Sequence, residues 1–301
     1  MKAIRSSEAA VDSGKICNSQ FAIRNFPAFT LIELLVVISI MGIIAALSVP
    51  ALKNLGKSNI AVSAGRQLLD DVGRARQLAV SQHTTVYMVF VKTNFWMAPS
   101  FPNPWWTDPK TTAPQKTAAT NLCDKQLTGY TFVSLRSVGD QPGHGTAHYL
   151  GPWHSLPDGT FIASQKFQAS NSPPFYISAY DPNLQIFGFS TANNIPFPTE
   201  DSQPSSGLNP PYLPYIAFNY LGQLTFDGQS LAKRDEYIPL AQGSVSPAID
   251  VVTKALVILL LPAGAASISE TPPGNSTNSM YNIIHIDRLT GRATLEYQRV
   301  K

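Results

Sequence analysis

The sequence predicts an α+β protein in which a long N-terminal helix packs on an antiparallel β-sheet domain with large loop insertions. An apolar segment at 29–49 runs into an amphipathic helical pattern at 50–82. β-branched and aromatic runs follow, separated by loops that hold most of the 24 prolines and 19 glycines. We therefore divide the chain into a leader at 1–28, these two helical segments, and a β-rich domain at 83–301.

Composition excludes several classes of protein. The 22 basic and 19 acidic residues give a net charge of +3, too small for a nucleic-acid-binding surface. A hydrophobic content of 44% is enough for a core and excludes disorder throughout. Cys17 and Cys123 allow at most one internal disulfide, so the chain is not a disulfide scaffold.

Segment 29–49 is the strongest single signal. Its one charged residue is Glu33, and as a helix it would be about 31 Å long, close to the thickness of a bilayer core. The preceding 1–28 carries four basic and two acidic residues, which favours its retention in the cytoplasm. We expect a transmembrane helix at 29–49, with everything after it exported.

Three interpretations of this segment compete on physical grounds. A cleavable secretory signal would use 34–47 as its apolar stretch and the small residues Ala45, Ala46 and Ser48 as its cleavage zone. A plain membrane anchor explains the length but not the glutamate. A carboxylate inside a bilayer is costly and suggests a partner, unless Glu33 only reaches back to the interface.

The string Phe-Thr-Leu-Ile-Glu-Leu-Leu-Val-Val at 29–37 resembles the processing signature of type IV pilins and type II secretion pseudopilins. The resemblance implies that prepilin peptidase cuts between Ala28 and Phe29 and methylates the new Phe29 amine, leaving the helix on the mature chain. The family pattern has glycine where this chain has Ala28. The helical stretch 65–79 and the segments 215–226 and 286–292 resemble the minor pseudopilin H and FimT-like group.

The same resemblance implies a pilin-like fold and a structural role, as a minor pilin or pseudopilin of a type II secretion or type IV pilus-like filament. The expected partners are other pilin or pseudopilin subunits, prepilin peptidase and the inner-membrane assembly platform. The chain would cross the bacterial inner membrane once, with its C-terminal domain in the periplasm. Glu33 would pair with the Phe29 amine of a neighbouring subunit, because a buried charge is expensive unless paired. The alternative is an exported enzyme or binding protein that uses the helix only as an anchor.

Further patterns locate the remaining elements. We expect Pro50 to interrupt the helix, and an apolar stripe to continue through Val62, Leu69, Val72, Ala75 and Ala79. Predicted strands cover Thr84–Val91, Tyr130–Leu135, Leu184–Phe189, Tyr215–Tyr220 and, as a buried strand, Ala255–Leu261. Hairpins are predicted at 218–226 and 283–297, and long loops at 99–120, 139–159 and 194–214.

Candidates for chemistry are few. His144, His148 and His154 are the best candidates for metal ligands, but the glycines around them indicate a loop, so their spacing does not place them on one helical face. We therefore expect no metal, no cofactor and no enzymatic activity. Trp105 and Trp106 belong to an aromatic tract that we expect to pack the first long loop onto the sheet.

Overall fold

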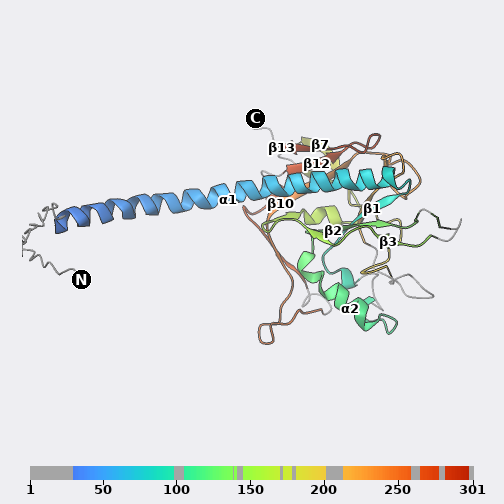
Figure 1. The fold of residues 1–301 in the computed structure, drawn as a ribbon, viewed down its shortest axis with the longest axis horizontal. Coiled ribbons are helices and arrows are strands. Elements are labelled where there is room, and N and C mark those ends of the chain that lie inside the picture. Colours follow the sequence, from blue (N-terminus) through green and yellow to red (C-terminus); the bar gives the residue numbers. More distant parts are fainter. Residues whose placement is uncertain are drawn as a thin grey trace, which may run out of the picture. The chain divides into compact units, whose positions relative to one another are not determined.

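The computed structural model describes residues 30–97, 105–137, 139–140, 145–169, 172–177, 181–200, 213–258, 265–277 and 282–297, without the side chains of 47–59, 181–183 and 297. The chain divides into two compact units, Met1–Leu52 and Lys53–Lys301. The predicted fold class is confirmed: the second unit packs a helix against antiparallel sheets, as in a pilin-like fold (Figure 1).

Helix α1 spans Leu31–Ser81. Within the second unit its inner face is lined by small and aliphatic side chains three or four residues apart, the spacing of one helical stripe. The fully buried members are Ala64, Leu68, Val72, Ala75 and Ala79. Two members of the predicted stripe, Val62 and Leu69, are only half-buried. The buried stripe is therefore centred about one residue earlier than predicted.

Pro50 lies within α1, so the helix does not end at the proline. No helix is long and apolar enough to cross a membrane in the part of the chain that the structure describes.

The larger sheet contains three of the strands predicted from the sequence. Its order is β3-β2-β1-β8-β9, and β4 also pairs with β2; all pairings are antiparallel. The bounds are β1 Val86–Phe90, β2 Gly129–Ser134, β3 His148–Tyr149, β4 His154–Ser155, β8 Tyr215–Phe218 and β9 Leu224–Thr225. The predicted strands at 84–91, 130–135 and 215–220 and the hairpin at 218–226 are confirmed.

A second sheet has the order β11-β10-β12-β13, with β5 also pairing with β10. Its bounds are β5 Thr160–Ile162, β10 Glu236–Ser246, β11 Ser267–Glu270, β12 Asn282–Ile286 and β13 Ala293–Tyr297. The hairpin predicted at 283–297 is β12–β13. Strands β6 Phe175–Ile177 and β7 Asp181–Ile186 form a separate pair; β7 covers only the first part of the strand predicted at 184–189.

The second unit has three layers, with α1 on one face of the larger sheet and a loop layer on the other (Figure 1). Strand β1 shows this directly: Val86, Met88 and Phe90 face the core beneath α1. The intervening Tyr87 and Val89 face a second core. That core is covered by α2 Ala113–Thr120 and by the short 3-10 turns η1 Phe95–Met97, η2 Trp105–Thr107 and η3 Cys123–Lys125.

Some predictions about the second unit are wrong, among them the long loop at 139–159, which contains strands β3 and β4. Residues 255–258 form no strand: they make one isolated bridge, Ile249 to Leu256, and Leu256 to Ile258 are half-buried; residues 259–261 lie outside the described part. The loop predicted at 99–120 contains helix α2. The longest strand, β10, was not predicted at all.

Candidate functional site

The first turn of α1 is built by a reciprocal pair of side chains. Thr30 precedes the helix, and its Oγ1 accepts a hydrogen bond from the Glu33 backbone N–H at 3.3 Å. The Glu33 carboxylate in turn accepts the Thr30 backbone N–H at 3.4 Å and the Thr30 hydroxyl at 3.2 Å. This is a capping box, the arrangement that Thr-x-x-Glu produces at a helix start. Glu33 thus has a local role within its own chain.

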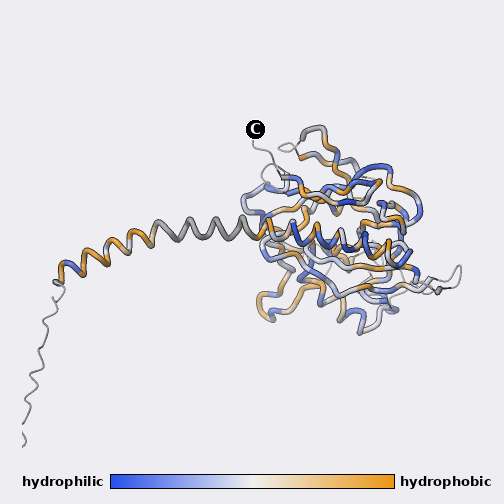
Figure 2. Tube along the Cα trace, turned by 45° about the horizontal axis from the view of Figure 1, so that its top comes forward, coloured by the Kyte–Doolittle hydropathy of each residue, from blue (hydrophilic) through white to orange (hydrophobic). Residues whose placement is uncertain are grey.

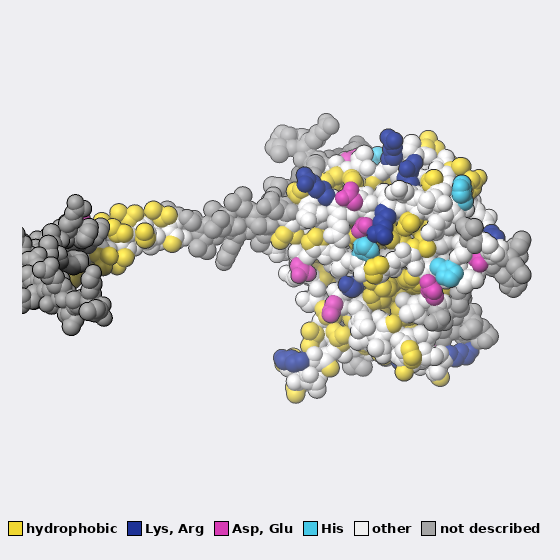
Figure 3. Space-filling view, in the orientation of Figure 1, with side chains coloured by type: hydrophobic (Ala, Val, Ile, Leu, Met, Phe, Trp, Pro, Cys, Tyr) yellow, Lys and Arg dark blue, Asp and Glu magenta, His cyan; other side chains and the backbone are white. Residues whose placement is uncertain are grey.

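The helix that follows is apolar on every side. All side chains from 31 to 46 are exposed, including Leu31 at 82%, Ile32 at 68% and Met41 at 64%. Figure 2 shows this stretch as mostly hydrophobic along its length, and Figure 3 shows hydrophobic side chains on the face of it that is in view. A helix that is hydrophobic all round is typical of a bilayer or of a bundle of helices.

The predicted processing residues, Ala28 and Phe29, lie outside the described residues. Of the predicted assembly residues, Glu33 is described, and Pro50 is described in its backbone only. The structure therefore places Glu33 two positions after the start of α1, at the entrance to the apolar segment.

Residues 23–49 match the prokaryotic N-terminal methylation motif. The motif implies a prepilin-like protein that prepilin peptidase processes and that is exported and anchored in the membrane by its N-terminal segment. It covers 27 of the 301 residues, and Glu33 lies inside it. Neither a curated protein nor a solved structure matches the chain significantly.

Outside the methylation motif, the predicted histidines do not come together. His148 pairs with Ser134 across β3 and β2, and His154 pairs with Tyr130 across β4 and β2. Four residues along β2 separate these positions by about 13 Å, too far for one metal ion. His144 lies outside the described residues. Among the residues described, no three His, Cys, Asp or Glu side chains form a group that could hold a metal.

His154 instead belongs to a polar network that sequence reasoning missed. Tyr130 donates its hydroxyl proton to Asp71 Oδ2 at 2.6 Å and accepts a hydrogen bond from Gln67 Nε2 at 2.9 Å. His154 Nδ1 lies 3.7 Å from the same Asp71 oxygen, and its ring stacks on Tyr130. Burial, reinforced by Asp71, raises the pKa of Tyr130 well above its usual value. The network attaches α1 to the larger sheet.

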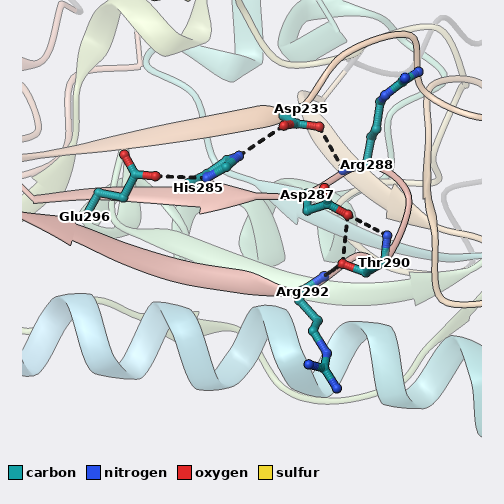
Figure 4. A network of polar contacts seen from close by, with 7 residues as sticks. All are labelled: Asp235, His285, Asp287, Arg288, Thr290, Arg292 and Glu296. Carbon is teal, nitrogen blue, oxygen red and sulfur yellow. Dashed lines mark hydrogen bonds and ion pairs between the residues drawn. The ribbon is translucent and has the colours of Figure 1, made fainter. Parts of the chain in front are cut away.

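A second polar network joins strands β12 and β13 of the second sheet to the start of β10 (Figure 4). His285 Nε2 lies 3.1 Å from Asp235 Oδ2, and its Nδ1 lies 2.9 Å from Glu296 Oε1. The ring also stacks on Tyr237, with centroids 4.6 Å apart and an interplanar angle of 7°. The two carboxylates contact opposite nitrogens, so they do not converge on a shared ligand position. In the neighbouring turn, hydrogen bonds from Thr290 hold the pKa of Asp287 below its usual value.

Two buried side chains of nucleophilic type, Lys166 and Cys123, are unsuited to that role. Lys166 is 1% exposed; its Nζ contacts the Glu236 carboxylate and donates to the Phe187 carbonyl oxygen at 2.7 Å. Burial lowers the pKa of Lys166, although Glu236 opposes the shift. Cys123 is a buried free thiol whose pKa burial raises to about 12, so it remains protonated at neutral pH and is a poor nucleophile.

The aromatic tract packs as predicted where it is described. Trp96 and Trp105 are buried, and Trp105 lies beside Phe197 in the second core. Trp106 is half-buried, with Lys116 Nζ 5.9 Å from its ring centroid. These side chains hold the loop layer on the larger sheet and form part of its core.

Proposed function

We propose that the chain is a structural subunit, a minor pilin or pseudopilin, of a type II secretion or type IV pilus-like filament. The main support for this proposal is the composition of the first turns of α1. Sixteen successive side chains from 31 to 46 are exposed, nearly all of them apolar, and the one charged side chain among them, Glu33, sits in the first turn. A membrane anchor alone needs the apolar length and would use the carboxylate only to cap the helix, through Thr30.

Assembly gives that carboxylate a partner. Cleavage before Phe29 would create a cationic amine at the end of the apolar helix. If helices of neighbouring subunits pack together, this amine is removed from water, and an unpaired buried charge costs several kcal/mol. Glu33 of the adjacent subunit can neutralise it, at the expense of its contacts with Thr30. The exchange would also fix the axial stagger between subunits.

The partners that this role requires are prepilin peptidase, the inner-membrane assembly platform and other pilin-type subunits. We assign no catalysis to the body. Three described groups that could act as nucleophiles or bases are held in structural surroundings: Cys123 is buried, Lys166 is paired with Glu236, and His285 is held between two carboxylates. The helix of 65–79 followed by β1, and the β8–β9 and β12–β13 hairpins, support placement in the pseudopilin H and FimT-like group.

The capping box permits a test that separates charge from helix capping. Glu33→Gln keeps an acceptor at the third helical position, where glutamine also completes a capping box, but removes the charge. Thr30→Val removes the capping hydroxyl and keeps the charge. We expect Glu33→Gln and Glu33→Leu to insert into the membrane normally.

In sheared filament fractions, we expect the two Glu33 variants to be depleted by at least about tenfold, because the buried amine loses its partner. We expect Thr30→Val to be incorporated at close to the wild-type level. Wild-type incorporation of Glu33→Gln would contradict the proposed pairing. Absence of the wild-type chain from the sheared fraction would contradict the filament role itself.

A further inference from the structure

His285, on β12, has a carboxylate oxygen within hydrogen-bond distance of each of its ring nitrogens. Nε2 lies 3.1 Å from Asp235 Oδ2, and Nδ1 lies 2.9 Å from Glu296 Oε1. A neutral imidazole has one N–H group and one lone pair, so one of these carboxylates would face the lone pair. The imidazolium form has two N–H groups and donates to both carboxylates. The two contacts together therefore fit the charged form of the ring.

The other groups around the ring also suit a positive charge. Tyr237, the residue opposite on β10, stacks on it, and the face of an aromatic ring attracts a cation. Asp287, in the turn after β12, interacts with it electrostatically. The side chains of Arg288 and Arg292 point away from it in Figure 4. The β6–β7 pair packs against Tyr237 and adds no charged side chain among those that the structure describes.

The ring links an edge strand to the interior of the sheet. Glu296 belongs to β13, which is last in the order β11-β10-β12-β13 and, within the described residues, pairs with β12 alone. Asp235, just before β10, is itself held in place, because its Oδ1 accepts the Arg288 backbone N–H at 3.0 Å. His285 thus ties β13 to the start of β10 across β12. A strand with one neighbour has few bonds opposing its local opening, so this tie matters most for β13.

We infer that His285 is a pH-sensitive clamp on β13. In its charged form the ring bridges Asp235 and Glu296. When the ring loses a proton, one bridge is lost and one carboxylate faces a lone pair, so β13 opens more often. The contacts favour the charged form, so the stabilisation is present at low pH and is lost as the pH rises through the range in which histidine titrates. The clamp lies within one chain and does not depend on the proposed filament role.

Hydrogen–deuterium exchange of the full-length protein in detergent tests the clamp. Exchange is followed by mass spectrometry at about pH 6 and about pH 9, on either side of the range in which histidine titrates, and corrected for the pH dependence of intrinsic exchange. We expect β13 to open about tenfold more often at the higher pH, the change expected for loss of one charge-assisted hydrogen bond. Strand β1, buried on both faces, is the internal reference and should change by less than about twofold.

Three variants separate the clamp from other titrating groups. Glu296→Gln keeps the histidine, but an amide can accept from the charged ring or donate to the neutral one, so the pH effect on β13 should fall below about twofold. His285→Phe keeps a ring beside Tyr237 and cannot titrate, so it should also abolish the effect. His83→Asn is the matched control: His83 is exposed, and its replacement should leave the full tenfold effect on β13.

Equal opening of β13 at the two pH values in the wild-type chain would overturn the inference. So would a pH effect that persists in Glu296→Gln or in His285→Phe, because another group would then control the strand. A pH effect of the same size on β1 would also contradict it, since the change would then be global rather than confined to the edge of the second sheet.

Discussion

Arg76, close to the end of α1, donates a hydrogen bond from Nε to the backbone carbonyl oxygen of Thr290 at 2.7 Å. The same Nε lies 3.2 Å from the Gly222 carbonyl oxygen. Gly222 is in the β8–β9 turn and Thr290 in the β12–β13 turn, so one side chain joins the helix to both sheets. We therefore treat Arg76 as the link that holds the three elements at this end of the body.

Replacing Arg76 by methionine should lower the free energy of unfolding by about 1–3 kcal/mol, because two carbonyl groups lose a charged donor. Arg66→Met is the matched control: Arg66 is exposed on the same helix, and its loss should change stability by less than about 0.5 kcal/mol. Urea unfolding of the full-length protein in detergent, followed by tryptophan fluorescence, reports on the body, which holds all four tryptophans. Equal stabilities of the two variants would contradict the role given to Arg76.

The two turns also touch directly, through glycine. Gly291 has φ +61°, and a Cβ built on it would lie 1.9 Å from the Gly222 carbonyl oxygen. Gly291→Ala should therefore destabilise the body by at least about 2 kcal/mol. Gly73→Ala should do the opposite, by about 0.5–1 kcal/mol, since Gly73 is inside α1 and nothing lies within 4 Å of its Cβ position. Shifts of the same sign in a urea titration would contradict this packing.

Lys166 and Glu236 should behave as a buried ion pair. Glu236→Gln leaves the ammonium group without a counter-charge in an apolar site, and we expect a loss of about 3–5 kcal/mol. Lys166→Met combined with Glu236→Gln removes both charges and should be clearly more stable than Glu236→Gln alone. A double-mutant cycle measures this coupling. Additive losses would show that the two side chains do not depend on each other.

Buried tyrosines predict unfolding at alkaline pH. Burial raises the pKa of Tyr149 far above its usual value, and Glu200 adds to the shift. Since the folded pKa exceeds the unfolded value of about 10, the unfolded chain loses its proton first and stability falls as the pH rises above about 10. Tyr149→Phe should reduce this slope by about 1 kcal/mol per pH unit between pH 10 and 11, where the unfolded tyrosine is partly deprotonated. Parallel stability curves for wild type and variant between pH 10 and 11 would contradict the assignment.

The strands that were predicted correctly are those whose burial in the fold matches the pattern of their own residues. β1 is apolar at every position because α1 covers one face and the loop layer the other. The sequence of β10 carries a weak strand signal, because Pro239 argues against a central strand. The structure accommodates the proline because the Ala163 carbonyl oxygen, which stands opposite, accepts from Lys166 N–H instead. That arrangement depends on a turn 76 residues earlier in the chain and has no local signal.

In the candidate site, too, local relationships have a signal in the sequence and long-range contacts have none. The Thr30–Glu33 capping box is a local relationship for which the pattern Thr-x-x-Glu is a signal, although it was not predicted. The contacts of His285 with Asp235 and of Arg76 with Thr290 join distant segments, and no local spacing reveals them. The predicted strand at 255–261 failed for a related reason: its apolar residues 256–258 are half-buried against the second core, a role that a uniformly apolar run does not distinguish from a strand.

Mass spectrometry of the mature N-terminus tests the central claim most directly. Processing by prepilin peptidase predicts a chain that begins at N-methylated Phe29 and retains all of α1. An intact Met1 would contradict processing and favour a simple membrane tether. A chain that begins near Leu47 would contradict the account more deeply, because ordinary secretion would then have removed Glu33 and the apolar segment on which assembly depends.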